Sequence, residues 1–495
     1  MPSLFDRHLK EKRLQAKAKK RPAKSQPTAI VQATKNASEK SGNYLQVERL
    51  SHDGRGVARD AQGKIVFISG VLPHEEVTVQ ISASHSRFNE GVARSIKQPS
   101  AQRISPTCRH FGECGGCSLQ HASLSAQLEF KQASTAELLA HQINSEHDLQ
   151  VLPEPSPTIE SKPYGYRRKA RFAVTETKNQ PFICGFRARD SKQIIAIHEC
   201  PVLEPDLQSL VPQLQAFLPS LQGRANIGHV EMIAAEPRPR LLVRQLKPLP
   251  SRDKLAWEQF AQQANVTVVF AMNAAGKDSK QLTYQQLGHA EVEPMYYSFQ
   301  DSSGSGGDFE PIRLSFQAHD FLQVNADVNT AMIQQAIAWI QPQSQEIGLD
   351  LFSGFGNFTL PLSRHCRKIV GVEGVSEQVR RAEQNAKENR CLNASFAVAN
   401  LDQPLQQQSW AKQQYDFIML DPPRSGALEI CQQIIHFGAR RILYVSCNPT
   451  TLARDAAILI AAGYRIARYS VIDMFPQTAH SETMVLFERN EVERD

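Results

Sequence analysis

The stretch IGLDLFSGFGNF, residues 347–358, decides the fold. It begins as an apolar strand, reaches an acid at Asp350 and then enters a turn with glycines at positions 354 and 356. Further β-type runs at 368–372, 417–420 and 442–445 alternate with helical segments such as 326–340. Strands that alternate with helices predict a parallel α/β sheet of the Rossmann type in the C-terminal part of the chain.

The glycine turn predicts a nucleotide-type cofactor site. Its glycines let a ligand approach the backbone, and Glu373, at the tip of the second strand, suits the two hydroxyls of a ribose. Taken alone, a short glycine turn after a strand is more often structural. The third position of the dinucleotide fingerprint is Thr359 instead of Gly or Ala, so the loop fits S-adenosylmethionine better than NAD. The loop DPPRSG, 421–426, supports this interpretation, because a rigid acid-Pro-Pro turn can position a target base beside a methyl donor.

One cysteine in YVSCNP, 444–449, is the candidate nucleophile. Cys447 follows a predicted strand at the edge where ligands bind in open α/β sheets, although an arbitrary cysteine is more often a core thiol. Methyl transfer to a pyrimidine carbon needs a thiol: addition at C6 makes C5 nucleophilic, and a base must then remove the C5 proton. Glu482 in HSE, 480–482, is the candidate base, and the alternative is a surface acid at the start of a last strand over 483–488.

The details of these motifs separate the classes of methyltransferase. Cytosine-C5 DNA enzymes carry their cysteine in the fourth-strand motif, where this chain has Pro423. RNA cytosine-C5 enzymes have a cysteine in both motifs, and this chain has only one. Amino-methylating enzymes have an aromatic residue after the two prolines, where this chain has Arg424. The remaining class methylates uracil at C5.

A second set of cysteines indicates a metal site. Cys108, Cys114 and Cys117 have the spacing C-x5-C-x2-C, and Cys200 follows alone. Four thiolates can hold zinc or an iron–sulfur cluster, and a triplet with one distant cysteine favours the cluster. Four other cysteines stand singly and are predicted to be core thiols: Cys184, Cys366, Cys391 and Cys431.

The N-terminal part differs in composition. Residues 1–40 hold eleven lysines and arginines against three acids, a net charge of +8, whereas the whole chain carries +6. We expect a disordered basic tail that either aids solubility or binds a polyanion. Residues 41–99 read as short strands with glycine turns, which predicts an OB-like barrel, and this stretch resembles the TRAM domain of RNA-modifying enzymes. A central α+β region over 100–315 is expected to contain a helix at 124–141 and a loop at 302–308.

Two further expectations concern location and RNA contact. The 495 residues contain no apolar run long enough to span a bilayer and no signal peptide, so the cytoplasm is the default location. The segment YGYRRKARF, 164–172, would place Arg167, Lys169 and Arg171 on one face of a strand. That face could be a phosphate track or an ordinary solvated surface.

The chain resembles the RNA uracil-C5 methyltransferase family, in particular the branch that acts on 23S ribosomal RNA. The resemblance is carried by HDFLQVN (319–325), the glycine loop, DPPRSG, SCNP (446–449) and HSE, and with the barrel and the cysteines it extends over most of residues 41–495. It implies an S-adenosylmethionine-dependent methyltransferase domain over 316–495, with Cys447 as nucleophile and Glu482 as base. It also implies cofactor contacts from Gln323, Phe352, Asn357, Glu373, Asn400 and Asp421.

The resemblance has further implications. It implies a [4Fe-4S] cluster on Cys108, Cys114, Cys117 and Cys200. The quartet and the barrel also distinguish the ribosomal branch from the transfer-RNA branch, which has neither. Ser353 stands where relatives often have cysteine. Phe321 is a candidate for stacking on an extruded uracil, and we expect a monomer that binds 23S ribosomal RNA and no membrane. The alternatives are a uracil at another 23S site or in transfer RNA, and a non-catalytic RNA-binding iron–sulfur assembly factor.

Overall fold

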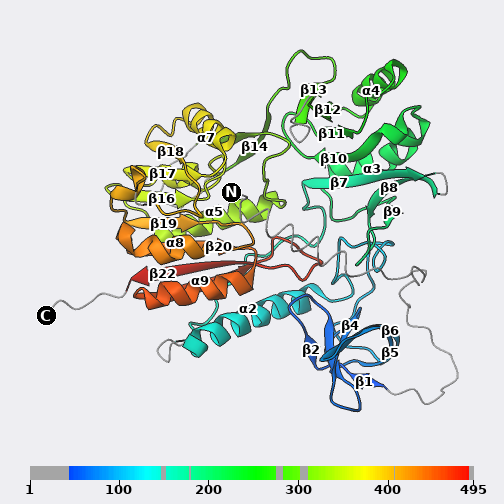
Figure 1. Cartoon of the computed structure of the whole chain (residues 1–495), viewed down its shortest axis with the longest axis horizontal. Helices are drawn as coiled ribbons and strands as arrows, with labels where there is room; N and C mark the ends of the chain where they lie inside the picture. Colours follow the sequence, from blue (N-terminus) through cyan, green and yellow to red (C-terminus); the bar gives the residue numbers. More distant parts are fainter. Residues whose placement is uncertain are drawn as a thin grey trace, which may run out of the picture.

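The computed structural model describes residues 44–146, 152–177, 180–274, 282–300, 310–405 and 407–489. Three sheets form the body of the molecule, and the long helix α2 (Leu124–Glu146) runs beneath the C-terminal one (Figure 1). The basic tail predicted at 1–40 and the loop predicted at 302–308 lie outside the described residues.

The C-terminal sheet has seven strands in the order β18-β17-β16-β19-β20-β22-β21. Its strands are β16 (Ile347–Leu351), β17 (Lys368–Glu373), β18 (Ala394–Val398), β19 (Phe417–Leu420), β20 (Arg441–Ser446), β21 (Tyr464–Ile472) and β22 (Glu482–Arg489). The first five are parallel to their neighbours, as predicted, whereas β22 runs antiparallel between β20 and β21. The sheet is therefore parallel at its centre and antiparallel at one side.

Alternation along the central strands explains why helices cover both faces. Phe417 and Met419 belong to one buried cluster, and Ile418 and Leu420 belong to the other. A strand with apolar side chains on both faces must be covered on both sides. The helices are α5 (Ala326–Ile340), α6 (Thr359–Ser363), α7 (Ser376–Glu388), α8 (Leu428–Gln433) and α9 (Pro449–Ala461), with the short turns η3 (Trp410–Lys412) and η4 (Ile434–Phe437). The predicted helix over 326–340 is confirmed as α5.

The N-terminal strands form a six-stranded sheet in the order β1-β5-β6-β4-β3-β2. Its members are β1 (Leu45–Gln46), β2 (Arg49–Leu50), β3 (Gly56–Arg59), β4 (Ile65–Ser69), β5 (Glu76–Ser84) and β6 (Phe88–Gln98). A small core of valines, isoleucine and alanine fills it, including Val47, Val66 and Ile68. This sheet lies at the end of α2, away from the central region (Figure 1).

The central sheet has seven strands in the order β13-β12-β11-β10-β7-β8-β9. They are β7 (Lys169–Thr177), β8 (Gln180–Arg187), β9 (Ile194–Ala196), β10 (Ile227–Ile233), β11 (Arg240–Gln245), β12 (Thr267–Asn273) and β13 (Leu282–Gln286). Helices α3 (Pro205–Phe217) and α4 (Ser251–Gln263) cover one face, with the turns η1 (Leu218–Ser220) and η2 (Arg224–Asn226).

The other face of the central sheet shares a core with the C-terminal sheet. Ile233 and Val269 belong to the same buried cluster as the hairpin β14 (Met295–Phe299) and β15 (Ile312–Phe316) and as helix α5. The two regions are therefore packed as one body. In the described part of the chain, no helix is both long and apolar enough to cross a membrane.

One buried ion pair joins α2 to the C-terminal sheet. Lys131 Nζ lies 2.5 Å from Asp473 Oδ1, and the two side chains are 0% and 1% exposed. The ammonium also donates to the carbonyl of Phe475 at 3.0 Å. A buried charge that loses its partner is costly, whereas a well-packed apolar pair of similar volume is not.

Replacing Asp473 with alanine should therefore lower the stability by about 3–5 kcal/mol, because Lys131 would remain buried and unpaired. The midpoint of urea unfolding, followed by circular dichroism, measures the change. The double variant Lys131→Met/Asp473→Leu should recover most of the loss. Equal losses in the single and double variants would contradict this account.

Candidate active site

The predicted site residues gather at the carboxyl edge of the C-terminal sheet. Phe352, Asp421 and Cys447 each follow directly after the last residue of β16, β19 and β20, and Glu373 ends β17. Because these four strands are parallel and adjacent, their carboxyl ends meet at one edge. Asn400 follows β18 at the same edge, on the outermost strand.

The glycine loop has the backbone geometry that close approach of a ligand requires. Phe352 has a φ of 66°, which is rare for a non-glycine residue and is held by hydrogen bonds from the amides of Phe352 and Ser353 to the Val372 carbonyl. Gly356 has a φ of 102°, and a Cβ there would lie 2.3 Å from Leu360. Only glycine fits that position.

The predicted cofactor residues differ in how free their side chains are. Glu373 accepts hydrogen bonds from the amides of Gly354 (3.2 Å) and Val375 (3.0 Å), so its carboxylate lies against the glycine loop. Asn357 is committed within the protein: its Oδ1 accepts from Tyr297 and Asn329. Asn357 would therefore contact a cofactor mainly through its backbone.

Two further predicted cofactor residues differ in whether their side-chain oxygens already accept a hydrogen bond. Gln323 is buried, its amide donates to Asp421 Oδ2 at 3.5 Å, and its Oε1 makes no hydrogen bond within the described chain. The exposed Asn400 caps its own turn by accepting from the amide of Asp402 at 3.0 Å. Gln323 thus retains a buried acceptor that a ligand can satisfy.

The antiparallel register brings the candidate nucleophile and the candidate base together. Ser446 on β20 pairs with Thr483 on β22, and continuing the register by one residue sets Cys447 opposite Glu482. Directly opposite residues on antiparallel strands lie about 4.5–5.5 Å apart at their Cα atoms. The two residues that the sequence singled out therefore meet across two strands, although 34 residues of chain lie between them.

Burial and mutual repulsion make the site electrostatically unusual. Glu482 is 3% exposed, its Oε2 makes no hydrogen bond in the described residues, and burial together with Asp421 raises its pKa to about 8. Burial also raises the pKa of Asp421 to about 7, against the opposing hydrogen bond from Gln323. The pKa of the Cys447 thiol is raised by burial and then by Glu482 and Asp421, while Arg424 opposes the rise. Glu482 is therefore a buried acid, and the alternative of a surface acid is wrong.

The acid-Pro-Pro loop and the cysteine loop are tied to each other. Asn448 caps α9 by accepting from the amide of Thr450 (3.2 Å), and its amide donates to the carbonyl of Arg424 (3.0 Å). The hydroxyl of Thr451 reaches the same carbonyl at 3.3 Å. An asparagine directly after the nucleophile thus fixes both the helix start and the neighbouring loop.

Sequence reasoning missed a buried arginine that supports the HDFLQVN segment. Arg168 Nε donates to the carbonyl of Gln323 at 2.5 Å, and its guanidinium lies 4.3 Å from the ring centroid of Tyr297. Burial lowers the pKa of Arg168. In the sequence, Arg168 is indicated only by its place in the cation-rich run at 164–172. In the same segment Phe321 is 68% exposed, as a stacking residue must be.

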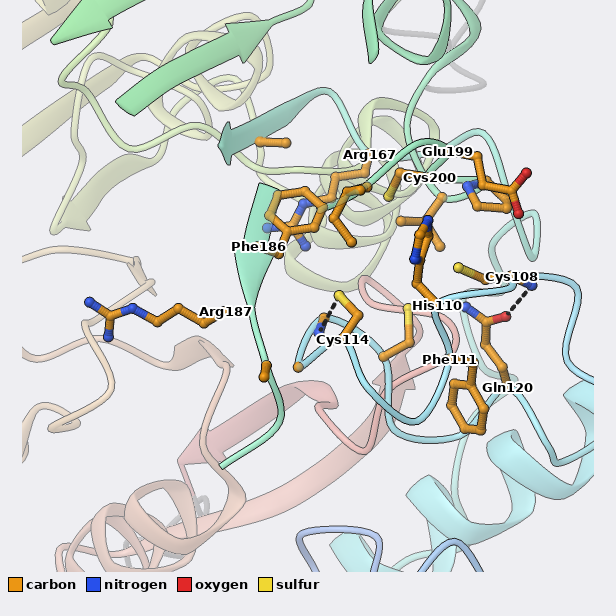
Figure 2. A pocket seen from close by; sticks show the side chains of 18 of the residues that line it. Cys108, His110, Phe111, Cys114, Gln120, Arg167, Phe186, Arg187, Glu199 and Cys200 are labelled. Carbon is orange, nitrogen blue, oxygen red and sulfur yellow. Dashed lines mark hydrogen bonds between the residues drawn. The ribbon is translucent and has the colours of Figure 1, made fainter. Parts of the chain in front are cut away.

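The proposed phosphate track is partly neutralised. Lys169 Nζ donates to the carbonyl of Ala318 at 2.8 Å and lies 3.8 Å from Glu231, and Arg171 pairs with Glu231 at 2.5 Å. Arg167 is turned toward the cysteine pocket instead (Figure 2). The three cations therefore do not form a free stripe of positive charge.

Cys108, Cys114, Cys117 and Cys200 line one cavity of about 690 Å³ (Figure 2). They reach it from the loop before α2 and from the segment after β9, while Arg187 extends away from the cavity. The Gly116 amide donates to Cys114 Sγ at 3.4 Å, a contact typical of metal-bound thiolates, and Arg189 donates to the Cys117 carbonyl at 2.7 Å. Burial raises the pKa of the Cys117 thiol to about 11, so without a metal it is protonated.

The four thiols line the same cavity. Among the described residues, no three side chains of Cys, His, Asp or Glu are close enough to share one metal ion. The four cysteines predicted as core thiols (Cys184, Cys366, Cys391 and Cys431) are buried, which confirms that prediction.

Comparison with known proteins agrees with this geometry. Residues 310–490 match the family model described as tRNA (Uracil-5-)-methyltransferase, and residues 45–93 match the TRAM domain. A protein from Pectobacterium atrosepticum named 23S rRNA (uracil(1939)-C(5))-methyltransferase RlmD is 40% identical over 92% of this chain and 95% of its own length. A protein of the same name from Pseudomonas putida is 41% identical over 90% of this chain and 93% of its own.

A solved structure extends the comparison to the whole fold. The tRNA (uracil-54, C5)-methyltransferase of Pyrococcus abyssi, in complex with S-adenosyl-L-homocysteine, superposes with a TM-score of 0.67. It is 20% identical and covers 90% of this chain and 100% of its own. This similarity shows that the two chains share their fold.

The raised pKa of Glu482 has a consequence for stability. The group binds a proton in the folded protein up to a pH of about 8 but loses it near pH 4.5 when unfolded, so stability should fall as the pH rises through that window. One such group contributes at most about 1.4 kcal/mol per pH unit. Glu482→Gln should therefore raise the melting temperature of the ligand-free protein more at pH 8 than at pH 5. The exposed Glu429→Gln is the matched control, and an equal effect of both substitutions at both pH values would contradict the burial argument.

Proposed function

Because the chain belongs to the RNA uracil-C5 methyltransferase family, we propose that it transfers the methyl group of S-adenosylmethionine to C5 of one uracil in 23S ribosomal RNA. The position named for its relatives is uracil 1939. The observation that carries the proposal is the register of β20 and β22, which sets Cys447 opposite Glu482 beside Asp421. A thiol and a base at adjacent positions are what addition to C6 and removal of the C5 proton require.

The first step belongs to Cys447. Its thiolate attacks C6 of the uracil, and the electron pair moves toward C5 and the O4 carbonyl, so that C5 becomes nucleophilic. In the ligand-free site burial and two carboxyl groups disfavour the thiolate, and the exposed Arg424 favours it. A bound cation would favour the ionised forms of all three acidic groups, and a sulfonium is such a cation.

S-adenosylmethionine, when bound, supplies an electrophilic methyl group. We assign its contacts to Gln323, Phe352, Asn357, Glu373, Asn400 and Asp421, with Glu373 at the ribose hydroxyls and Asn357 acting through its backbone. The free Gln323 Oε1 and the left-handed backbone at Phe352 support this assignment.

The last step belongs to Glu482. Its carboxylate takes the C5 proton, the electrons of that bond form the C5–C6 double bond, and the bond from C6 to Cys447 breaks to release the thiolate. The raised pKa of Glu482 supports a role as base, because a base is most effective when its pKa is near the working pH. The exposed Phe321 is suited to stack on the extruded uracil.

We further propose that Cys108, Cys114, Cys117 and Cys200 hold a [4Fe-4S] cluster. Support comes from the shared cavity and from the amide that Gly116 donates to Cys114. Methyl transfer needs no electron, so the cluster would serve structure or RNA binding. An OB-like closure of the N-terminal sheet with RNA on its face, the domain limits, a cytoplasmic location and a monomeric state remain predictions.

Transfer RNA is the second candidate substrate. The matching family model and the structurally similar Pyrococcus enzyme both carry transfer-RNA names. The ribosomal substrate is favoured because relatives with that name match about nine tenths of the chain at 40% identity. Methylation assays on a 23S fragment and on an unmodified transfer RNA separate the two.

A stem-loop RNA carrying 5-fluorouracil tests the mechanism. Fluorine at C5 prevents the final elimination, so with S-adenosylmethionine present we expect a slow-migrating protein–RNA band on a denaturing gel. The band should be absent in Cys447→Ala and present in Cys431→Ala, which removes a buried thiol outside the site. No band with an RNA that binds would refute the covalent mechanism and favour the non-catalytic assembly factor.

Metal analysis tests the cysteine site. Protein purified without oxygen should contain about four iron and four sulfide per chain, and Cys114→Ala should lose most of both. Cys184→Ala is the matched control, because that thiol is buried in the same region but does not line the cavity. Stoichiometric zinc without iron would refute the cluster. Unchanged fold and RNA affinity in Cys114→Ala would refute its structural and RNA-binding role.

A further inference from the structure

The residues that lead into Glu482 form a loop whose shape is imposed from outside the C-terminal sheet. This loop, residues 473–481, connects β21 to β22 and is called the base loop here. Its centre, Gln477, is buried and has a φ of 67°, a left-handed conformation that a non-glycine residue adopts only when its surroundings hold it. The contacts that hold it come from two separate elements.

Helix α2 provides the first set of contacts. The side-chain amide of Gln127 donates to Gln477 Oε1 at 3.1 Å, and the backbone amide of Gln477 donates to Gln127 Oε1 at 2.8 Å. One turn along the same helix, Lys131 binds Asp473 and the Phe475 carbonyl. Helix α2 therefore contacts the base loop through polar side chains at two positions, and the contact between Gln127 and Gln477 is reciprocal.

The cysteine segment provides the second set. The amides of Ser118 and Leu119, directly after Cys117, both donate to the Gln477 carbonyl at 2.9 Å. The Ala479 amide donates back to Ser118 Oγ at 3.0 Å. Tyr166, from the central region, donates its hydroxyl to the Pro476 carbonyl at 2.9 Å.

The nucleophile is held differently. Cys447 lies between β20 and α9, where Asn448 caps the helix and binds the Arg424 carbonyl. None of the hydrogen bonds described for Asn448 or Thr451 reaches the base loop. A disturbance of the base loop should therefore move Glu482 more than it moves Cys447.

We propose that Ser118, Gln127 and Tyr166 are positioning residues that hold Glu482 for the removal of the C5 proton. This rests on the proposed function, in which Glu482 is the base. The proposal assigns a structural role to the four-cysteine site, since methyl transfer involves no electron transfer. The segment that carries Cys117 supports the loop that leads to the base. The chemistry affected is the elimination alone, in which the carboxylate takes the proton and the C6–sulfur bond breaks.

The test compares Ser118→Ala/Gln127→Ala with the wild type and with Gln132→Ala. Gln132 lies on α2 but binds Thr158 instead of the base loop, so it is a matched control. Formation of the adduct is followed with 5-fluorouracil RNA, and elimination is followed with ordinary uracil RNA and S-adenosylmethionine. We expect the double variant to form the 5-fluorouracil adduct within about twofold of the wild-type rate. Product release should slow about 10- to 100-fold, because small misplacements of a catalytic group have effects of this size, and a covalent band should accumulate on ordinary RNA.

Hydrogen exchange provides a readout that does not depend on activity. The amides of Gln477 and Ala479 should exchange faster in the double variant than in the wild type, because each loses its side-chain acceptor. Tyr166→Phe removes one hydroxyl and keeps the ring, so it tests the same idea if the double variant does not fold. Ser118→Thr keeps the hydroxyl and should restore normal release.

The outcomes separate this inference from the proposed function. If the wild type forms no adduct, the proposed function fails. A second outcome is that the wild type forms the adduct and Glu482→Gln accumulates a covalent band. If the double variant and Tyr166→Phe then release product normally, only the positioning role fails. An equal loss of adduct formation and elimination, with Gln132→Ala unaffected, would also overturn it, since the role would then be general support of the site.

Discussion

The insertion of β22 antiparallel between β20 and β21 is the constraint on which the site depends. In a wholly parallel sheet the last strand would begin at the opposite edge, and Glu482 would lie a strand's length from the nucleophile. Reversal brings the first residue of β22 to the carboxyl edge and sets it opposite Cys447. The same pairing buries Glu482 between two strands, which raises its pKa to about 8.

That reversal creates a second requirement. The chain must return from the end of β21 to the start of β22 through a loop that closes over the edge of the sheet, and Gln477 adopts a left-handed backbone there. Such a conformation persists only where its surroundings determine it. Helix α2, the cysteine segment and Tyr166 supply that support through buried hydrogen bonds. The C-terminal sheet is therefore not self-sufficient as a catalytic unit, because its base loop is shaped by residues far earlier in the chain.

Burial and mutual repulsion raise the pKa values of three acidic groups at this edge of the sheet. Burial raises the pKa of Asp421 to about 7 and that of Glu482 to about 8, and burial together with these two carboxyl groups raises the pKa of the Cys447 thiol. Three groups that resist ionisation in the same place form a site suited to a cationic ligand. Arg424 is the cation that opposes the rise in the pKa of the Cys447 thiol.

The sequence by itself determined the parallel strands, helix α5 and the glycine turn, and it predicted Cys447 and Glu482 as the candidate nucleophile and base, because period-two apolar patterns, turn residues and short motifs are local. It also predicted the four cysteines that share a cavity. Only the tertiary structure decided the direction of β22, the burial of Glu482 and the commitment of the Asn357 side chain to Tyr297 and Asn329. The reason is physical: strand register, burial and hydrogen-bond partners depend on residues tens of positions apart or more, and no local pattern records which of them will meet.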